Sequence, residues 1–94
     1  MVKGILFNED VAEISAELED EFIGVKCVKL VSPANSFGIG VYPSIPTTID
    51  ETLLRKCLAI ARKRGLTAYI YALDKGIAVI IAENELYHHI ESSV

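Results

Sequence analysis

The stretch that decides the fold is Thr47–Ala82, which reads TTIDETLLRKCLAIARKRGLTAYIYALDKGIAVIIA. Arg and Lys lie on one side of its first half, and apolar residues at helical spacing lie on the other: Leu53, Leu54, Cys57, Leu58 and Ala61. We expect this helix to begin at Thr48, because a threonine cap followed three residues later by Glu51 forms a capping box. Gly65 follows a basic last turn and supplies the left-handed residue that ends a helix.

Two apolar runs, 67–73 and 77–82, follow this helix and predict a β-hairpin. Asp74 and Lys75 suit the centre of a type I turn, and Gly76 suits a bulge residue with positive φ. Both faces of the hairpin are apolar, whereas one face of a two-layer domain is normally polar. We therefore expect the second face to be covered by the C-terminal tail, by a second copy of the chain or by a partner.

The remainder of the chain completes a two-layer α+β domain. We expect a strand over 2–7, a helix capped by Asn8 and ended by Gly24, and strands over 25–31 and 37–42. In the last of these, Gly38 and Gly40 leave one face bare. The order predicts a ferredoxin-like (βαββαβ) sheet with two helices on one face, plus an extra C-terminal hairpin strand and a short helical tail over 84–94.

Length and composition indicate a single domain spanning 1–94, since 94 residues with 51% hydrophobic and 23% charged content suit one small core. We expect a soluble, cytoplasmic protein, because no apolar run is long enough for a membrane span and no secretory signal precedes the first helix. Cys27 and Cys57 are interpreted as free buried thiols. His88 and His89 are adjacent and would point apart on a helix, so we expect no metal and no cofactor.

Charge is divided between the two predicted helices. Seven of the thirteen acidic residues lie between Glu9 and Glu21, and five of the nine basic residues lie between Arg55 and Arg64. Glu13 and Glu17 are candidates for contact with a basic partner, and Arg62 and Arg64 are candidates for an anionic one, although basic residues at a helix end also complement the helix dipole. Tyr69 and Tyr71 share one face of a strand and are further interface candidates.

A glycine-rich segment, Asn35–Tyr42, resembles in part the third-strand signature of RNA-recognition domains. The resemblance implies base stacking on Phe37 and Tyr42. Asn35 and Ser36 stand where that signature has a basic residue and a glycine, and Ile39 stands where it has a second aromatic. Close approach of another layer of side chains explains the two glycines equally well.

No arrangement of nucleophile, base and acid emerges from the sequence. The chain is therefore interpreted as a small non-enzymatic protein-interaction or regulatory module that self-associates through its apolar hairpin face. Two alternatives remain open. One is a single-stranded nucleic-acid-binding domain. The other is a small-molecule-binding regulatory domain with a site between protomers, around 43–48 and the basic cluster at the helix end, Arg62, Lys63 and Arg64.

Overall fold

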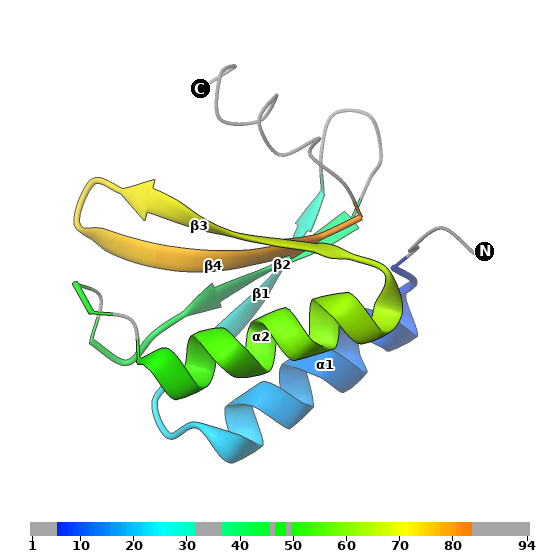
Figure 1. The fold of residues 1–94 in the computed structure, drawn as a ribbon, viewed down its shortest axis with the longest axis horizontal. Coiled ribbons are helices and arrows are strands. Elements are labelled where there is room, and N and C mark those ends of the chain that lie inside the picture. The colour runs from blue at the N-terminus through cyan, green and yellow to red at the C-terminus, as the bar shows by residue number, and fades with distance from the viewer. Residues whose placement is uncertain (1–5, 32–36, 46, 49, 84–94) are drawn as a thin grey trace.

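The computed structural model describes residues 6–31, 37–45, 47–48 and 50–83. Two helices lie on one face of a four-stranded antiparallel sheet (Figure 1). The elements are α1 (Asn8–Glu21), β1 (Lys26–Val31), β2 (Phe37–Tyr42), α2 (Glu51–Arg64), β3 (Thr67–Leu73) and β4 (Gly76–Ala82). The expected α+β class with two helices on one face of an antiparallel sheet is confirmed.

The strand order is β1-β2-β4-β3, which differs from the expected ferredoxin-like arrangement. That arrangement would place an N-terminal strand beside β2, but β4 occupies this position and pairs with β2 from Gly38↔Ala82 to Val41↔Val79. The tight turn between β3 and β4 keeps the two strands adjacent. Of the two, β4 carries the continuous buried run 78–82 and takes the central position, whereas β3, which is largely exposed at its end, takes the edge. The hairpin strand is therefore central rather than an addition at the edge.

Most of the predicted strand over 2–7, and all of the predicted tail over 84–94, lie outside the described residues. Leu6 and Phe7 are described and are not in a strand. Leu6 is nonetheless buried, and its N–H donates to Glu83 Oε2 at 2.8 Å. The other oxygen of the same carboxylate accepts from the N–H of Phe37 at 3.0 Å. Glu83, directly after β4, thus ties the start of α1 to the start of β2.

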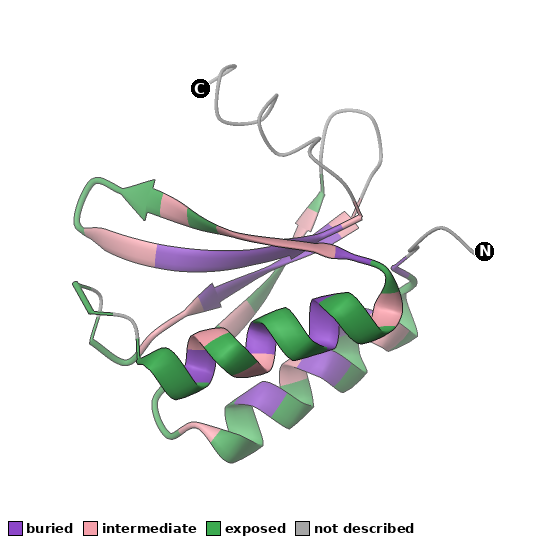
Figure 2. Cartoon of the chain, viewed as in Figure 1, coloured by how far each residue is buried: buried purple, intermediate pink, exposed green. Residues whose placement is uncertain are grey.

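The core lies between the helices and the sheet. Its largest fully buried side chains come from both layers: Leu6, Ile14, Leu18, Ile39, Val41, Leu53, Cys57, Val79 and Ile81. Figure 2 shows buried residues, in purple, in both helices and in the central strands. The apolar spacing of both helices aims these side chains at the two central strands. α1 packs on β1 and β2, whereas α2 packs on β3 and β4.

The outer face of the sheet carries a second apolar cluster, in which Ile80 and Ala82 pack with Leu30, Tyr69 and Tyr71. The sequence predicted that this face would be bare at β2, but neighbouring side chains fill it. A Cβ at Gly40 would lie 3.1 Å from Tyr42 Oη and 3.3 Å from Leu30 Cδ1. The glycine therefore makes room for neighbouring side chains on this face, in agreement with the close-approach interpretation.

Three local boundaries differ from the sequence-based expectation. α2 begins at Glu51, because the Asp50 side chain accepts from Thr52 N–H at 2.8 Å and replaces Thr48 as the cap. α1 begins at Asn8, and the N–H of its cap Phe7 donates to Asp10 at 2.9 Å. Gly76 does not have positive φ and is not a bulge, since the ladder continues to Leu73↔Gly76 and leaves a two-residue loop. Gly65 is left-handed as predicted, with φ of 70°.

Candidate functional site

The acidic and basic candidates pair with each other across the two helices. Arg64 contacts Asp10 at 3.2 Å and Glu13 at 2.5 Å, and Lys56 contacts Glu17 at 2.8 Å and Glu21 at 3.3 Å. The hydrogen bond from Lys56 lowers the pKa of Glu17 and raises the pKa of Lys56. Glu13, Glu17 and Arg64 therefore hold α1 against α2.

Arg62 lies on a different side of α2 and is exposed. It belongs to a stripe at spacings of three and four that runs along the side of α2 facing away from α1: Glu51, Leu54, Leu58 and Arg62. Leu58 is exposed in this stripe, and Leu54 is partly buried against the core. The stripe is acidic at the helix start, apolar in the middle and basic at the end.

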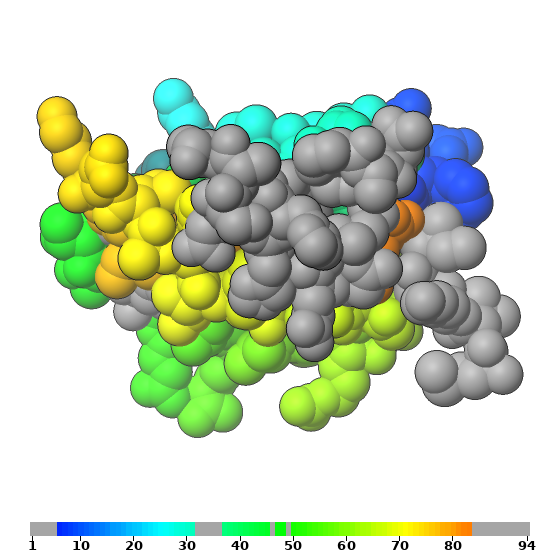
Figure 3. Space-filling view, turned by 90° about the horizontal axis from the view of Figure 1, so that it is seen from above, coloured from blue at the N-terminus to red at the C-terminus, as the bar shows by residue number. Residues whose placement is uncertain are grey.

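β3 is one of the two edge strands of the described sheet, and its side chains from Thr67 to Leu73 carry no charge. Ile70, at its centre, is 54% exposed, and Leu73 is also exposed. Within the described sheet, β3 pairs with β4 alone, and an uncharged edge strand is a template for pairing with another strand. Figures 1 and 3 show β3, in yellow, beside α2, in green, along one side of the molecule.

The opposite edge strand, β1, is protected. Lys26 and Lys29 interrupt its apolar run, and the N–H of Cys27 donates to Glu19 Oε2 on α1 at 2.9 Å. Lys29 also donates to Asn8 at the start of α1. Charged side chains and occupied backbone donors are the means by which proteins prevent edge-to-edge pairing. The two edges are therefore chemically different.

The aromatic candidates do not form one surface. Phe37 packs against the core on the helix side of the sheet, where Lys29 Nζ lies 4.6 Å from its ring centroid. Tyr42, five residues along the same strand, lies on the outer face and crosses Gly40. Tyr69 and Tyr71 are on that outer face, partly buried beside Ile80. A stacking platform that combines Phe37 with Tyr42 is not assembled, so nucleic-acid binding stays a prediction.

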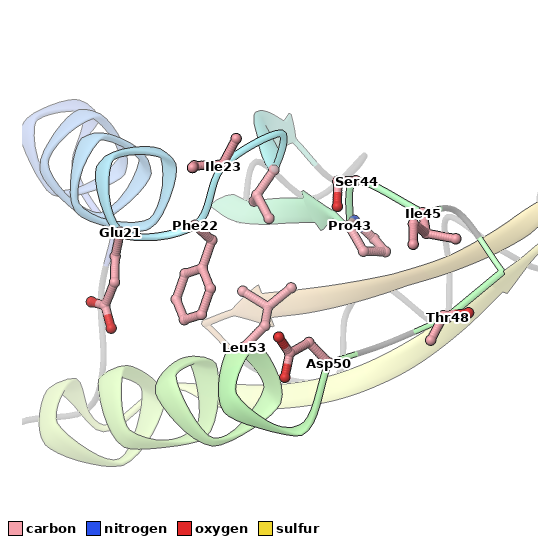
Figure 4. Close-up of a pocket in the computed structure, with 10 residues that line it drawn as sticks. Glu21, Phe22, Ile23, Pro43, Ser44, Ile45, Thr48, Asp50 and Leu53 are labelled. Carbon is pink, nitrogen blue, oxygen red and sulfur yellow. The ribbon is translucent and has the colours of Figure 1, made fainter.

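A pocket of about 510 Å³ lies at the end of the molecule where α2 begins (Figure 4). Residues from the α1–β1 connection, the β2–α2 connection and the first turn of α2 line it: Glu21, Phe22, Ile23, Val25, Pro43, Ser44, Ile45, Thr48, Asp50 and Leu53. Its shape depends on Gly24, which has φ of 84° and whose added Cβ would lie 2.7 Å from Ser44 Cβ.

The pocket is apolar with two carboxylates, and Ile23 at its rim is 94% exposed. It includes much of the segment 43–48 that the sequence singled out, but not the basic cluster. Arg62 and Arg64 lie at the other end of α2, which is about 20 Å long. Periodicity gave no signal for Ile23, because it stands outside both the helix and the strand and joins the pocket only through the Gly24 turn.

The two cysteines are free and lie on the core side of the molecule. Burial raises the pKa of the Cys57 thiol to about 12, and burial together with the nearby Glu19 raises the pKa of Cys27 to about 11. Both thiols are protonated at neutral pH, which makes them poor nucleophiles.

Among the described residues, no three His, Cys, Asp or Glu side chains are grouped in a way that could hold a metal ion. No helix in the described part of the chain has the length and apolarity to cross a membrane. Comparisons with protein-family models, with curated proteins and with solved structures gave no significant match.

Proposed function

We propose that the chain is a small non-enzymatic protein-interaction module that self-associates through its hairpin. The observation that supports this proposal is the asymmetry of the sheet edges. β3 has no charged side chain and exposes Ile70, whereas β1 carries two lysines and a donor occupied by Glu19. Strand addition at such an edge combines backbone hydrogen bonds with apolar side-chain contact.

The proposed contact uses the edge of the hairpin rather than the centre of its outer face. Ala78 and Ala82 are fully buried there, and Ile80 is only 4% exposed. The apolar hairpin residues with large exposed area are Ile70 and Leu73. Contact through the edge would remove both from water.

Sedimentation velocity over a micromolar concentration range tests the proposal. We expect a dimer for the wild type and a monomer for Ile70→Lys, because a charge in the centre of the paired strand would be buried without a partner. Val31→Lys is the matched control, since Val31 points to the same face from β1 and is 50% exposed. A monomeric wild type, or equal dissociation by Val31→Lys, would contradict the proposal.

A second candidate, small-molecule binding, is favoured by the pocket beside Ser44. Its volume of about 510 Å³ lies within the range of ligand sites, which is about 300 to 1,000 Å³. Fragment screening by NMR tests it, with Thr48→Trp as a variant that fills the pocket. Chemical-shift changes confined to the pocket in the wild type and lost in Thr48→Trp are the supporting result. A screen without such changes would remove this candidate.

A further inference from the structure

Resting on the proposed function, we infer that the partner of β3 is a second copy of β3 in antiparallel register about Ile70, with the two α2 helices packed side by side and each Glu51 facing Arg62 of the other copy. The proposed interface is isologous, because the same residues of both copies contact each other around a twofold axis at Ile70. It is carried by the symmetry of the β3 sequence, by the position of α2 over β3 and by the charges at the two ends of the stripe on α2.

The sequence of β3 suits pairing with itself. Ile70 is the central residue of the seven in Thr67–Leu73. A twofold axis there places Ile70 opposite Ile70 and Ala68 opposite Ala72 on the helix side. On the outer side the same register places Tyr69 opposite Tyr71, which forms aromatic cross-strand pairs of the kind that stabilise antiparallel strands. No pair brings two like charges together, because the strand has none.

The position of α2 lets the helices meet when the strands pair. α2 packs on β3 and β4, so its axis lies inside the edge by about half a strand spacing. Two such offsets plus one new strand spacing separate the two helix axes by roughly 10 Å, which is the usual distance between packed helices. The exposed Leu58 and the partly buried Leu54 are on the side of α2 that would face the other helix.

The midpoint of the stripe on α2 lies over the midpoint of β3. α2 and β3 run in opposite directions and are joined only by Gly65 and Leu66. The helix between residue 56 and its end at Arg64 is about 12 Å long, at 1.5 Å per residue. The chain between Leu66 and Ile70 is about 13 Å long, at 3.3 Å per residue. The point midway between Leu54 and Leu58 therefore lies over Ile70.

The charges on α2 are complementary about that point. Antiparallel α2 helices bring the acidic start of one beside the basic end of the other, so that Glu51 and Arg62, which sit nearly equidistant from the centre, face each other twice. Glu51 pairs with Arg55 of its own helix at 2.7 Å, and both side chains are about three-quarters exposed. Such a carboxylate is free to accept a second guanidinium.

A charge-swap experiment tests this arrangement. Glu51→Arg and Arg62→Glu each create like-charge pairs in a homodimer, and we expect each to weaken it by about tenfold. Mixing the two variants restores both opposite-charge pairs. Native mass spectrometry of the mixture should then show a heterodimer fraction well above the statistical half. Circular dichroism verifies that each variant is folded.

Lys63→Glu is the matched control, because Lys63 is exposed in the same last turn but lies on another side of the helix. When it is mixed with Glu51→Arg, the heterodimer fraction should not exceed the statistical half. A wild-type dimer that Ile70→Lys dissociates, but whose charge-swap variants mix statistically, would overturn this arrangement and leave the proposed function standing. A monomeric wild type would overturn both.

Discussion

The carboxylate of Glu19 accepts a hydrogen bond from the backbone N–H of Cys27, 2.9 Å away, and so connects the last turn of α1 to edge strand β1. The contact occupies a backbone donor that a foreign strand could otherwise use. It also separates the roles of the two edges, because β1 is engaged with its own helix while β3 presents only uncharged side chains. The association proposed here depends on this difference.

Glu19→Ala tests the stabilising part of that contact. Removing the acceptor leaves the Cys27 N–H to water at the sheet edge, so we expect the free energy of unfolding to fall by about 1 kcal/mol. Urea denaturation measures the change. Asp20→Ala, at the next exposed position of α1, serves as the control and should change stability by less than half as much. Equal effects of the two substitutions would contradict a specific role for Glu19.

The pairing of Glu17 with Lys56 makes stability depend on pH. The hydrogen bond from Lys56 holds the pKa of Glu17 below its ordinary value of 4.5 in the folded state. Its stabilising effect is therefore fully present above pH 4.5 and is lost as the pH falls through the lower, folded-state pKa.

The wild type should exceed Glu17→Gln in stability at neutral pH, and the difference should shrink as the pH falls below 4.5. Thermal unfolding across the acid range measures it. High salt should reduce the same difference, because both side chains are partly exposed. A difference that stays constant with pH would show that the ion pair does not contribute.

We expect stability to depend strongly on Glu83. Its two oxygens accept from Leu6 and Phe37, which lie 77 and 46 residues away in sequence. Glu83→Ala leaves both partly buried donors without this acceptor, and we expect a loss of about 2 to 3 kcal/mol in chemical denaturation. Glu83→Gln keeps one acceptor oxygen and should lose less. An alanine variant as stable as the wild type would be inconsistent with the contact.

Gly24 should resist substitution for two separable reasons. Alanine at φ of 84° is strained by about 1 to 2 kcal/mol, and its Cβ would also lie 2.7 Å from Ser44 Cβ. Gly24→Ala should therefore destabilise more than Gly65→Ala, which has only the strain of φ 70°. Ser44→Gly removes the clashing atom, so the double variant should recover about 1 kcal/mol in a double-mutant cycle. Strict additivity would show that the two connections do not touch.

Local chemistry in the sequence predicts the elements well. Gly65 after a basic turn sets the end of α2, and Asp74 with Lys75 sets the hairpin, because these are interactions between neighbours in sequence. The strand order is not local. Ile39 pairs with Ile81 across the sheet centre, and nothing in the alternation of either strand distinguishes this partner from an N-terminal strand.

The candidate site could likewise be predicted only in part, because it depends on contacts between residues that are distant in sequence. Grouping of charges along the chain indicated an acidic and a basic helix, but not that Arg64 reaches back to Asp10, 54 residues earlier. The position of β3 at an edge of the described sheet could not be predicted, because it depends on β4 taking the central position. The exposure of Ile70 follows from that order and not from its hydropathy.

The most direct test of the central claim is an isotope-filtered NOE measurement on a dimer that contains one methyl-labelled and one unlabelled protomer. Contact through β3 predicts intermolecular NOEs from the Ile70 methyl groups to Ile70 of the other protomer, together with contacts between Leu54 and Leu58 across the two α2 helices. Intermolecular NOEs at Val31 in their place, or none at all at concentrations suited to NMR, would contradict it.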